Sequence, residues 1–207
     1  MRYAYLHGFA SGPTSRKAQA FRAALKVQRI HLEIPDLAEG DFEHLTISSQ
    51  LSVIDRLLRG EPARLIGSSM GGYLAALYAA THPEIDRLAL LAPAFGFTLR
   101  WPALLGAKKL SQWKETGTMD FFHYGHNALR PLSFQLYEDA LAYPANPDFR
   151  QPARIYHGTN DDIVPVSFSR EFVANHPNAT LYEFNSGHEL LNVLDDITTS
   201  GTNFLLS

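Results

Sequence analysis

The chain has 207 residues, of which 45% are hydrophobic and 19% charged, as is ordinary for one soluble globular domain with a substantial core. The net charge of -3 is spread without a basic run, so we expect no nucleic-acid partner, and the absence of cysteine excludes disulfides. No segment approaches the ~20 apolar residues of a membrane helix, and the first residues hold no signal-peptide stretch. We therefore expect a cytoplasmic protein without a membrane partner, and the sequence leaves its oligomeric state open.

Short apolar runs alternate with helical patterns along most of the chain. Buried strands are predicted, in chain order, for residues 3–6, 29–34, 63–66, 88–91, 154–156 and 181–184. Helices are predicted, in chain order, for residues 15–26, 45–58, 72–80 and 167–175, and residues 190–194 continue the alternation. Repeated strand–helix alternation predicts a single α/β domain over residues 1–207, with a mostly parallel sheet and helices on both faces.

Residues 94–152 break this rhythm, because they contain no clear strand. The segment is rich in aromatic residues: Phe95, Phe97, Trp101, Trp113, Phe121, Phe122 and Tyr124. A long insertion of this kind in a compact fold is usually functional or has helices of its own. We therefore predict a small helical cap over the end of the sheet where a site would lie.

The strongest motif is Gly67-Ser68-Ser69-Met70-Gly71, which lies between a predicted strand and a predicted helix. In that context the pattern predicts a sharp turn that presents the hydroxyl of Ser69 as a nucleophile. Side chains two residues before and two residues after the serine would clash with neighbouring backbone, which explains both glycines. The N–H of Met70 is the expected oxyanion donor, while Ser68 is expected to be structural.

Three further motifs each follow a predicted strand. Phe9 follows His7-Gly8 after the first strand, where its N–H can supply a second oxyanion donor. The loop after residues 154–156 holds two acids, Asp161 and Asp162, and His188 follows the strand over 181–184. The chain order of serine, acid and histidine is the order expected of an α/β-hydrolase, in which the acid orients the histidine.

Five blocks of the sequence resemble the small bacterial α/β-hydrolases of the YqiA-like esterase family. They are Tyr5-Leu6-His7-Gly8-Phe9-Ala10-Ser11-Gly12-Pro13-Thr14-Ser15-Arg16-Lys17-Ala18, Ile66-Gly67-Ser68-Ser69-Met70-Gly71-Gly72-Tyr73, Ala92-Pro93-Ala94, His157-Gly158 with Asp161, and Gly187-His188. The resemblance spans the chain but is thin across the cap. It implies esterase activity on acyl esters or thioesters, a minimal fold that lacks the first two strands of larger relatives, and Asp161 rather than Asp162 as the acid.

We therefore expect a carboxylesterase that hydrolyses a small-molecule ester through an acyl-enzyme without a cofactor. Its apolar acyl pocket is expected to be lined by Phe9, Phe95, Trp101 and Trp113. An acyl-CoA thioesterase is the runner-up, with Lys108, Lys109 and Lys114 as candidate phosphate contacts. A non-catalytic ligand-binding protein is the alternative from another class.

No metal site is expected either. His123 and His126 form an H-x-x-H pattern, but no cysteine or paired carboxylate accompanies it at ligand spacing. His7 and His157, which each precede a glycine, are expected to form hydrogen bonds within their own loops.

Overall fold

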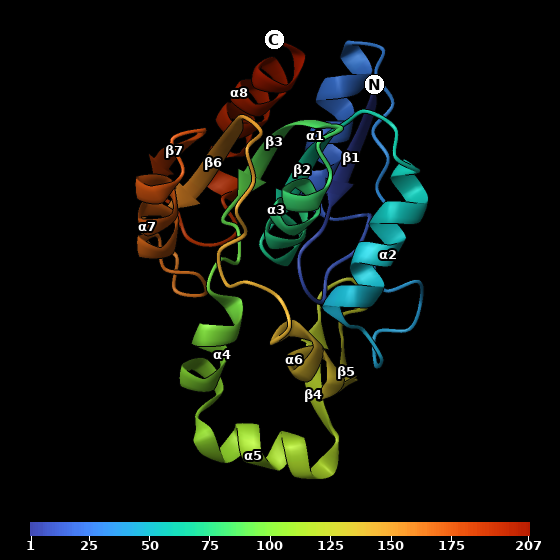
Figure 1. Cartoon of the computed structure of the whole chain (residues 1–207), viewed down its shortest axis with the longest axis vertical. Coiled ribbons are helices and arrows are strands. Elements are labelled where there is room, and N and C mark those ends of the chain that lie inside the picture. Colours follow the sequence, from blue (N-terminus) through green and yellow to red (C-terminus); the bar gives the residue numbers. More distant parts are fainter.

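The computed structural model describes all residues from Met1 to Ser207. Its centre is a parallel sheet with the strand order β1-β2-β3-β6-β7 (Figure 1). The strands are β1 (Arg2–Leu6), β2 (Ala63–Ser68), β3 (Ile85–Leu91), β6 (Ala153–Gly158) and β7 (Ala179–Phe184). Because the strands are parallel, the loops that follow them meet at one edge of the sheet, which is where the predicted motifs fall.

Helices cover both faces of this sheet. One face packs against α1 (Arg16–Val27) and α8 (Leu194–Leu206), and the other against α2 (Ile47–Leu58), α3 (Met70–Thr81) and α7 (Ser167–Asn175). A short 3₁₀ helix, η1 (Leu191–Val193), leads into α8. Successive residues of a strand point to opposite faces, so Leu65 and Ile66 of β2 belong to two different cores. The predicted architecture, a mostly parallel sheet with helices on both faces, is confirmed.

The strand predicted for residues 29–34 is wrong. Only Glu33 pairs with the sheet, in a single bridge to Ala4 at the edge formed by β1. Arg29 adopts a left-handed backbone conformation with φ of 59°, and Pro35 has no N–H to donate, so regular pairing is interrupted at both ends.

The insertion between β3 and β6 lies below the carboxyl ends of the strands in Figure 1. It contains α4 (Phe97–Leu105), α5 (Ala107–Thr116), β4 (Thr118–His123), β5 (Ala128–Ser133) and α6 (Gln135–Ala140). The predicted cap is therefore only partly helical, because β4 and β5 form an antiparallel hairpin. The sequence pattern did not predict β5 because the strand contains Pro131, and proline within a run argues against a regular strand except at sheet edges or bulges. No helix of the chain is long and apolar enough to span a bilayer.

Candidate active site

Ser69 lies at the tight turn between β2 and α3. Its backbone angles are φ 54° and ψ -117°, in a region that residues with a side chain rarely adopt. The turn is held by the Ser69 amide, which donates to the carbonyl of Leu91, and by the Ser69 carbonyl, which accepts from Gly72 and Tyr73. The strained turn therefore presents the hydroxyl at the carboxyl edge of the sheet, as the sequence motif predicts.

The two flanking glycines are required by close backbone packing. A Cβ atom added to Gly67 would overlap the backbone of Gly71 and Gly72. A Cβ atom added to Gly71 would overlap the backbone carbonyl groups of Leu6 and His7. A side chain at Gly67 would thus push β2 away from α3, and a side chain at Gly71 would push α3 away from the end of β1 and the loop that follows it.

His188 and Asp161 complete a chain of polar contacts to Ser69. The Nε2 atom of His188 lies 3.1 Å from Oγ of Ser69, and its Nδ1 atom lies 2.7 Å from Oδ2 of Asp161. The carboxylate can only accept, so Nδ1 carries the proton and donates to it, which leaves Nε2 to accept from the serine hydroxyl. Residues from three separate loops therefore meet in the order that acyl transfer requires.

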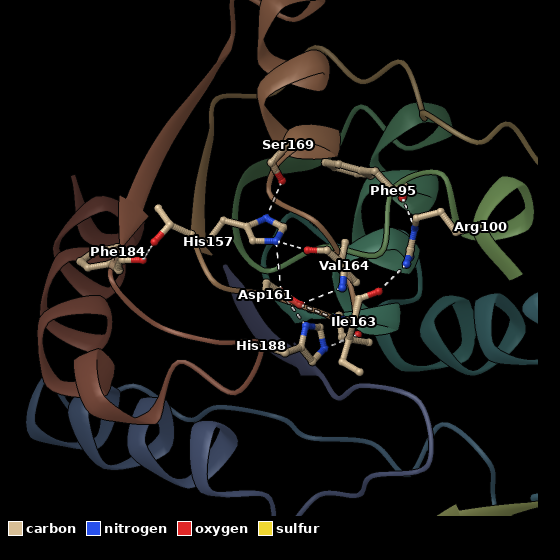
Figure 2. A network of polar contacts seen from close by, with 11 residues as sticks. Phe95, Arg100, His157, Asp161, Ile163, Val164, Ser169, Phe184 and His188 are labelled. Carbon is tan, nitrogen blue, oxygen red and sulfur yellow. Dashed lines mark hydrogen bonds and ion pairs between the residues drawn. The ribbon is translucent and has the colours of Figure 1, made fainter. Parts of the chain in front are cut away.

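Asp161 is held in place by its loop and by two histidines. Its Oδ1 atom accepts from the amides of Ile163 and Val164 at 3.0 and 2.8 Å, while Oδ2 contacts both His188 and His157 (Figure 2). Burial by itself would raise the pKa of Asp161, but the hydrogen bonds from His157 and His188 outweigh it and hold the pKa well below its ordinary value. Asp161 is therefore a buried, ionised carboxylate.

Asp162 differs from Asp161 in exposure and in its contacts. It is exposed, whereas the side chain of Asp161 is fully buried. No hydrogen bond or ion pair joins Asp162 to either histidine of the network. Of the two adjacent acids, Asp161 is thus the one that contacts His188.

Two backbone amides border the serine. Gly8 packs closely against Ser69, since a Cβ atom added to Gly8 would lie 3.3 Å from Cβ of Ser69. The loop after β1 therefore runs beside Ser69. The amide of Phe9 makes no hydrogen bond within the protein. Met70 is the first residue of α3, whose leading amides have no partner within the helix. Both amides are thus free to donate to a bound group.

A cavity of about 900 Å³ opens beside Ser69 and His188. Phe9 and Trp101 line it, as expected. Their rings pack edge to face, with their centroids 5.9 Å apart. Phe95 and Trp113 do not line it, so these two predictions are wrong. Phe95 is fully buried and stacks on Phe172 of α7 at 4.0 Å, and Trp113 is buried inside the cap, where its indole N–H donates to the carbonyl of Leu132.

The cavity is also lined by further apolar side chains of the aromatic-rich cap, beyond the four residues named from the sequence. They are Phe97, Leu104, Leu105, Phe121 and Phe122. Since these side chains are apolar and come from α4 and β4, this wall of the cavity suits a hydrocarbon group.

The charged residues near the site also differ from expectation. Lys108, Lys109 and Lys114 are exposed on α5 and none of them lines the cavity. Arg16 and Lys17 line it instead, although the sequence pattern of residues 15–26 predicted only an amphipathic helix. Both belong to the first of the five blocks that resemble the YqiA-like family, but the sequence does not show that they face the cavity, because this depends on how the start of α1 packs in the fold.

Three other histidines, His7, His123 and His126, lie outside the contact series of Ser69, His188 and Asp161. His7 is buried, with Nδ1 3.0 Å from the carbonyl of Gly8, and its Nε2 accepts from the amide of Leu37. His123 and His126 stack on each other at 4.2 Å in the cap hairpin. No group of three or more histidine, cysteine or carboxylate side chains is arranged to hold a metal ion.

Comparison with curated proteins finds two kinds of hydrolase. The chain is 27% identical over 157 residues to the pimeloyl-[acyl-carrier protein] methyl ester esterase of Chromobacterium violaceum, which covers 59% of this chain and 61% of that one. It is 29% identical over 113 residues to lysophospholipase L2 of Escherichia coli strain K12, which covers 48% and 33% respectively. The matched segments thus span less than two thirds of either relative.

Solved structures share the fold over nearly the whole chain. Est1E from Butyrivibrio proteoclasticus superposes with a TM-score of 0.80 at 21% identity, covering 99% of this chain and 86% of that one. Mouse alpha/beta hydrolase domain-containing protein 10 gives a TM-score of 0.82 at 18% identity, covering 99% and 90%. Paleococcus ferrophilus monoacylglycerol lipase gives 0.78 at 17%, covering 98% and 93%. The chain therefore has the α/β-hydrolase fold.

A family profile covers almost the full length of the sequence, from residue 2 to residue 200. Its match confirms the family resemblance that the sequence motifs indicate. The chain therefore belongs to UPF0227, an uncharacterised protein family.

Proposed function

We propose that the chain is a serine hydrolase that cleaves carboxylic esters through an acyl-enzyme intermediate. The observation that carries the proposal is the contact series from Ser69 through His188 to Asp161, with separations of 3.1 and 2.7 Å, in which Ser69 and His188 line the cavity. A nucleophile in reach of a base, with the base oriented by a third group, is the arrangement that activates a weak nucleophile.

Acylation begins when Oγ of Ser69 bonds to the carbonyl carbon of the ester and its proton passes to Nε2 of His188. The bond between that carbon and the alcohol oxygen then breaks, and the alcohol leaves with the proton from His188. Water next bonds to the acyl carbon and gives its proton to His188, which returns it to Ser69 as the acid departs. Asp161 stabilises the charged imidazolium in both halves, so ester and water yield acid and alcohol.

The amides of Phe9 and Met70 are proposed to stabilise the negative charge that develops on the carbonyl oxygen. Neither needs to give up a hydrogen bond to do so, because the Phe9 amide has no partner and Met70 begins α3. The positive end of the α3 dipole points to the same place and favours the oxyanion.

The acyl group is proposed to lie against the apolar cap wall formed by Phe97, Trp101 and Phe121. Such a wall favours uncharged hydrocarbon chains, since a charged acyl group would lose its hydration there. Two of the proteins named above are called an esterase and a lysophospholipase, which agrees with cleavage of acyl esters.

Hydrolysis of p-nitrophenyl butanoate tests the proposal. We expect turnover by the wild-type chain, a loss of at least about 10³-fold in Ser69→Ala, and no change in Ser52→Ala, a matched control at an exposed position of α2. Turnover of butanoyl esters should exceed that of succinyl esters. Absence of turnover on activated esters and thioesters alike would overturn the proposal in favour of a ligand-binding protein, and faster cleavage of the thioester would favour a thioesterase.

A further inference from the structure

The active-site cavity has two chemically different parts. The cap contributes mainly apolar side chains, together with Arg100, whose guanidinium donates to the carbonyls of Phe95 and Ile163. The start of α1 contributes Thr14, Ser15, Arg16 and Lys17. Two cations on the same short stretch raise the local positive potential beside the proposed reaction centre. An apolar ligand alone would leave this second part without a partner.

Lys17 is the central feature of this second part. The residue is only 8% exposed, yet its ammonium group has an ion pair as its polar contact and no hydrogen bond to a protein atom. Its single ionic neighbour is the carboxylate of Glu189, at 3.9 Å, and that side chain is 71% exposed. The side chain is mostly buried, and an ammonium with three donors and only such a distant, solvated partner is under-compensated.

Neighbouring groups are also without partners. The hydroxyl of Tyr5, which lines the same cavity, is completely buried and makes no hydrogen bond of regular geometry, with the Ser68 side chain as its nearest polar neighbour. At the start of α1, the N-cap residue Ser15 forms no side-chain cap, and the first turn holds no acidic residue. The positive end of this helix is therefore uncompensated where it borders the cavity.

We propose that Lys17 and the first turn of α1 form a subsite for an anionic group, a phosphate or a carboxylate, on the alcohol part of the substrate ester. The inference rests on the proposed function, because it takes the cap wall as the place of the acyl chain. An anion here would accept from the ammonium of Lys17, from exposed Arg16 and from free amides of α1, as anions do at helix N-termini.

The balance of charges around Lys17 agrees with binding of an anion. Burial lowers the pKa of Lys17, against the raising effect of the Glu189 and Asp161 charges. An anionic ligand would add a third favourable charge in direct contact. Glu189 is the competitor for the ammonium, and because it is mostly exposed it can turn to solvent at little cost when the ligand binds.

Binding of hexyl phosphate, hexanoate and 1-hexanol, measured by calorimetry, tests the subsite without relying on catalysis. We expect at least one anion to bind about tenfold or more tightly than the alcohol, and the preference to vanish in Lys17→Met, which keeps most of the apolar stem. Lys26→Met, at the exposed far end of α1, is the matched control and should keep the preference. Comparison of the two anions distinguishes a phosphate from a carboxylate.

If Lys17→Met does not fold, anion binding by the variant Glu189→Gln tests the same proposal. Removing the competing charge should tighten anion binding by about two- to threefold and leave hexanol binding unchanged. An anion preference that persists in Lys17→Met would place the anion at the oxyanion donors instead and overturn the proposal. Equal binding of anions and alcohol by the wild-type chain would overturn it too.

Kinetics separate the failure of this inference from the failure of the proposed function. Butanoyl esters of 2-hydroxyethyl phosphate and of 2-methoxyethanol differ in the charge of the alcohol part. We expect kcat/KM to favour the phosphate ester by about tenfold in the wild-type chain and in Lys26→Met, but not in Lys17→Met. Equal turnover of both esters would contradict the subsite alone, whereas no Ser69-dependent turnover of any ester would contradict the proposed function.

Discussion

The imidazole of His157 lies 3.2 Å from the same carboxylate oxygen of Asp161 that contacts His188 (Figure 2). Its Nε2 atom also lies 2.7 Å from the carbonyl of Val164, which can only accept, so Nε2 carries the proton. Its Nδ1 atom then accepts from the hydroxyl of Ser169 at 2.8 Å. His157 is fully buried, and its contacts join Asp161 and Val164 of the loop to Ser169 at the start of α7.

Replacement of His157 by Gln should lower kcat by about 10- to 100-fold while KM changes little. The reason is that Asp161 loses one of its two histidine donors and the position of His188 relaxes, while the cavity walls stay in place. His31→Gln, at an exposed position, is the matched control. Steady-state kinetics with melting curves would check this. A fall in melting temperature with kcat unchanged would show a structural role only.

Asp161→Asn should abolish most activity, with a loss of up to ~10⁴-fold in kcat, because an amide cannot hold the required tautomer of His188. Asp162→Asn should cost less than about twofold, since its side chain is exposed and contacts neither histidine. Both variants are measured on the same activated ester. Should Asp162→Asn prove to be the inactive variant, the assignment of the acid would be wrong, although Ser69 and His188 could stand.

The ionised state of Asp161 also predicts how stability responds to acid. Its pKa is lower in the folded chain than in the unfolded chain, so the carboxylate stabilises the fold above the unfolded value of ~3.9. That contribution is lost as pH falls below this value. Urea unfolding of wild type and Asp161→Asn should therefore give a difference that is constant from about pH 7 to about pH 5 and shrinks near about pH 3. A difference that grows on acidification would contradict the depressed pKa.

Gly71→Ala should destabilise the chain by at least about 2 kcal/mol and remove activity, since the added methyl group would overlap the Leu6 carbonyl. Gly12→Ala, where an added Cβ meets nothing within 4 Å, should leave the free energy of unfolding nearly unchanged. Denaturant melts of the two alanine variants provide the comparison. Equal stability of both would mean that the approach of α3 to the loop after β1 is not tight.

Local motifs predicted the parts of the site that depend on backbone geometry. Gly67 and Gly71 indicate the elbow because they lie two residues before and two residues after Ser69, where a single tight turn leaves no room for side chains. The position of His188 after a strand follows from the parallel sheet. The segment at 29–34 had the composition of a strand, but its place beyond edge strand β1 and the left-handed Arg29 prevent regular pairing. Such failures arise from tertiary context, which outweighs local pattern.

Local sequence patterns do not predict contacts between segments that are far apart in the chain. The hydrogen bond of His157 Nδ1 is made to Ser169 in α7, and the ionic neighbour of Lys17 is Glu189, far along the chain. Composition cannot distinguish Trp101, which lines the cavity, from Trp113, which is buried in the cap, because both are aromatic residues of one insertion. Which of them faces the site is decided by packing between cap elements.

Covalent labelling with a fluorophosphonate, followed by mass spectrometry of the digested protein, tests the central claim that Ser69 is an activated nucleophile. The adjacent base removes the proton of an activated serine during attack, so only such a serine reacts at an appreciable rate. We predict one adduct per chain, assigned by fragmentation to Ser69, and its loss in Ser69→Ala and in His188→Ala. An adduct on Ser68, or no adduct on the folded wild-type chain, would contradict the account.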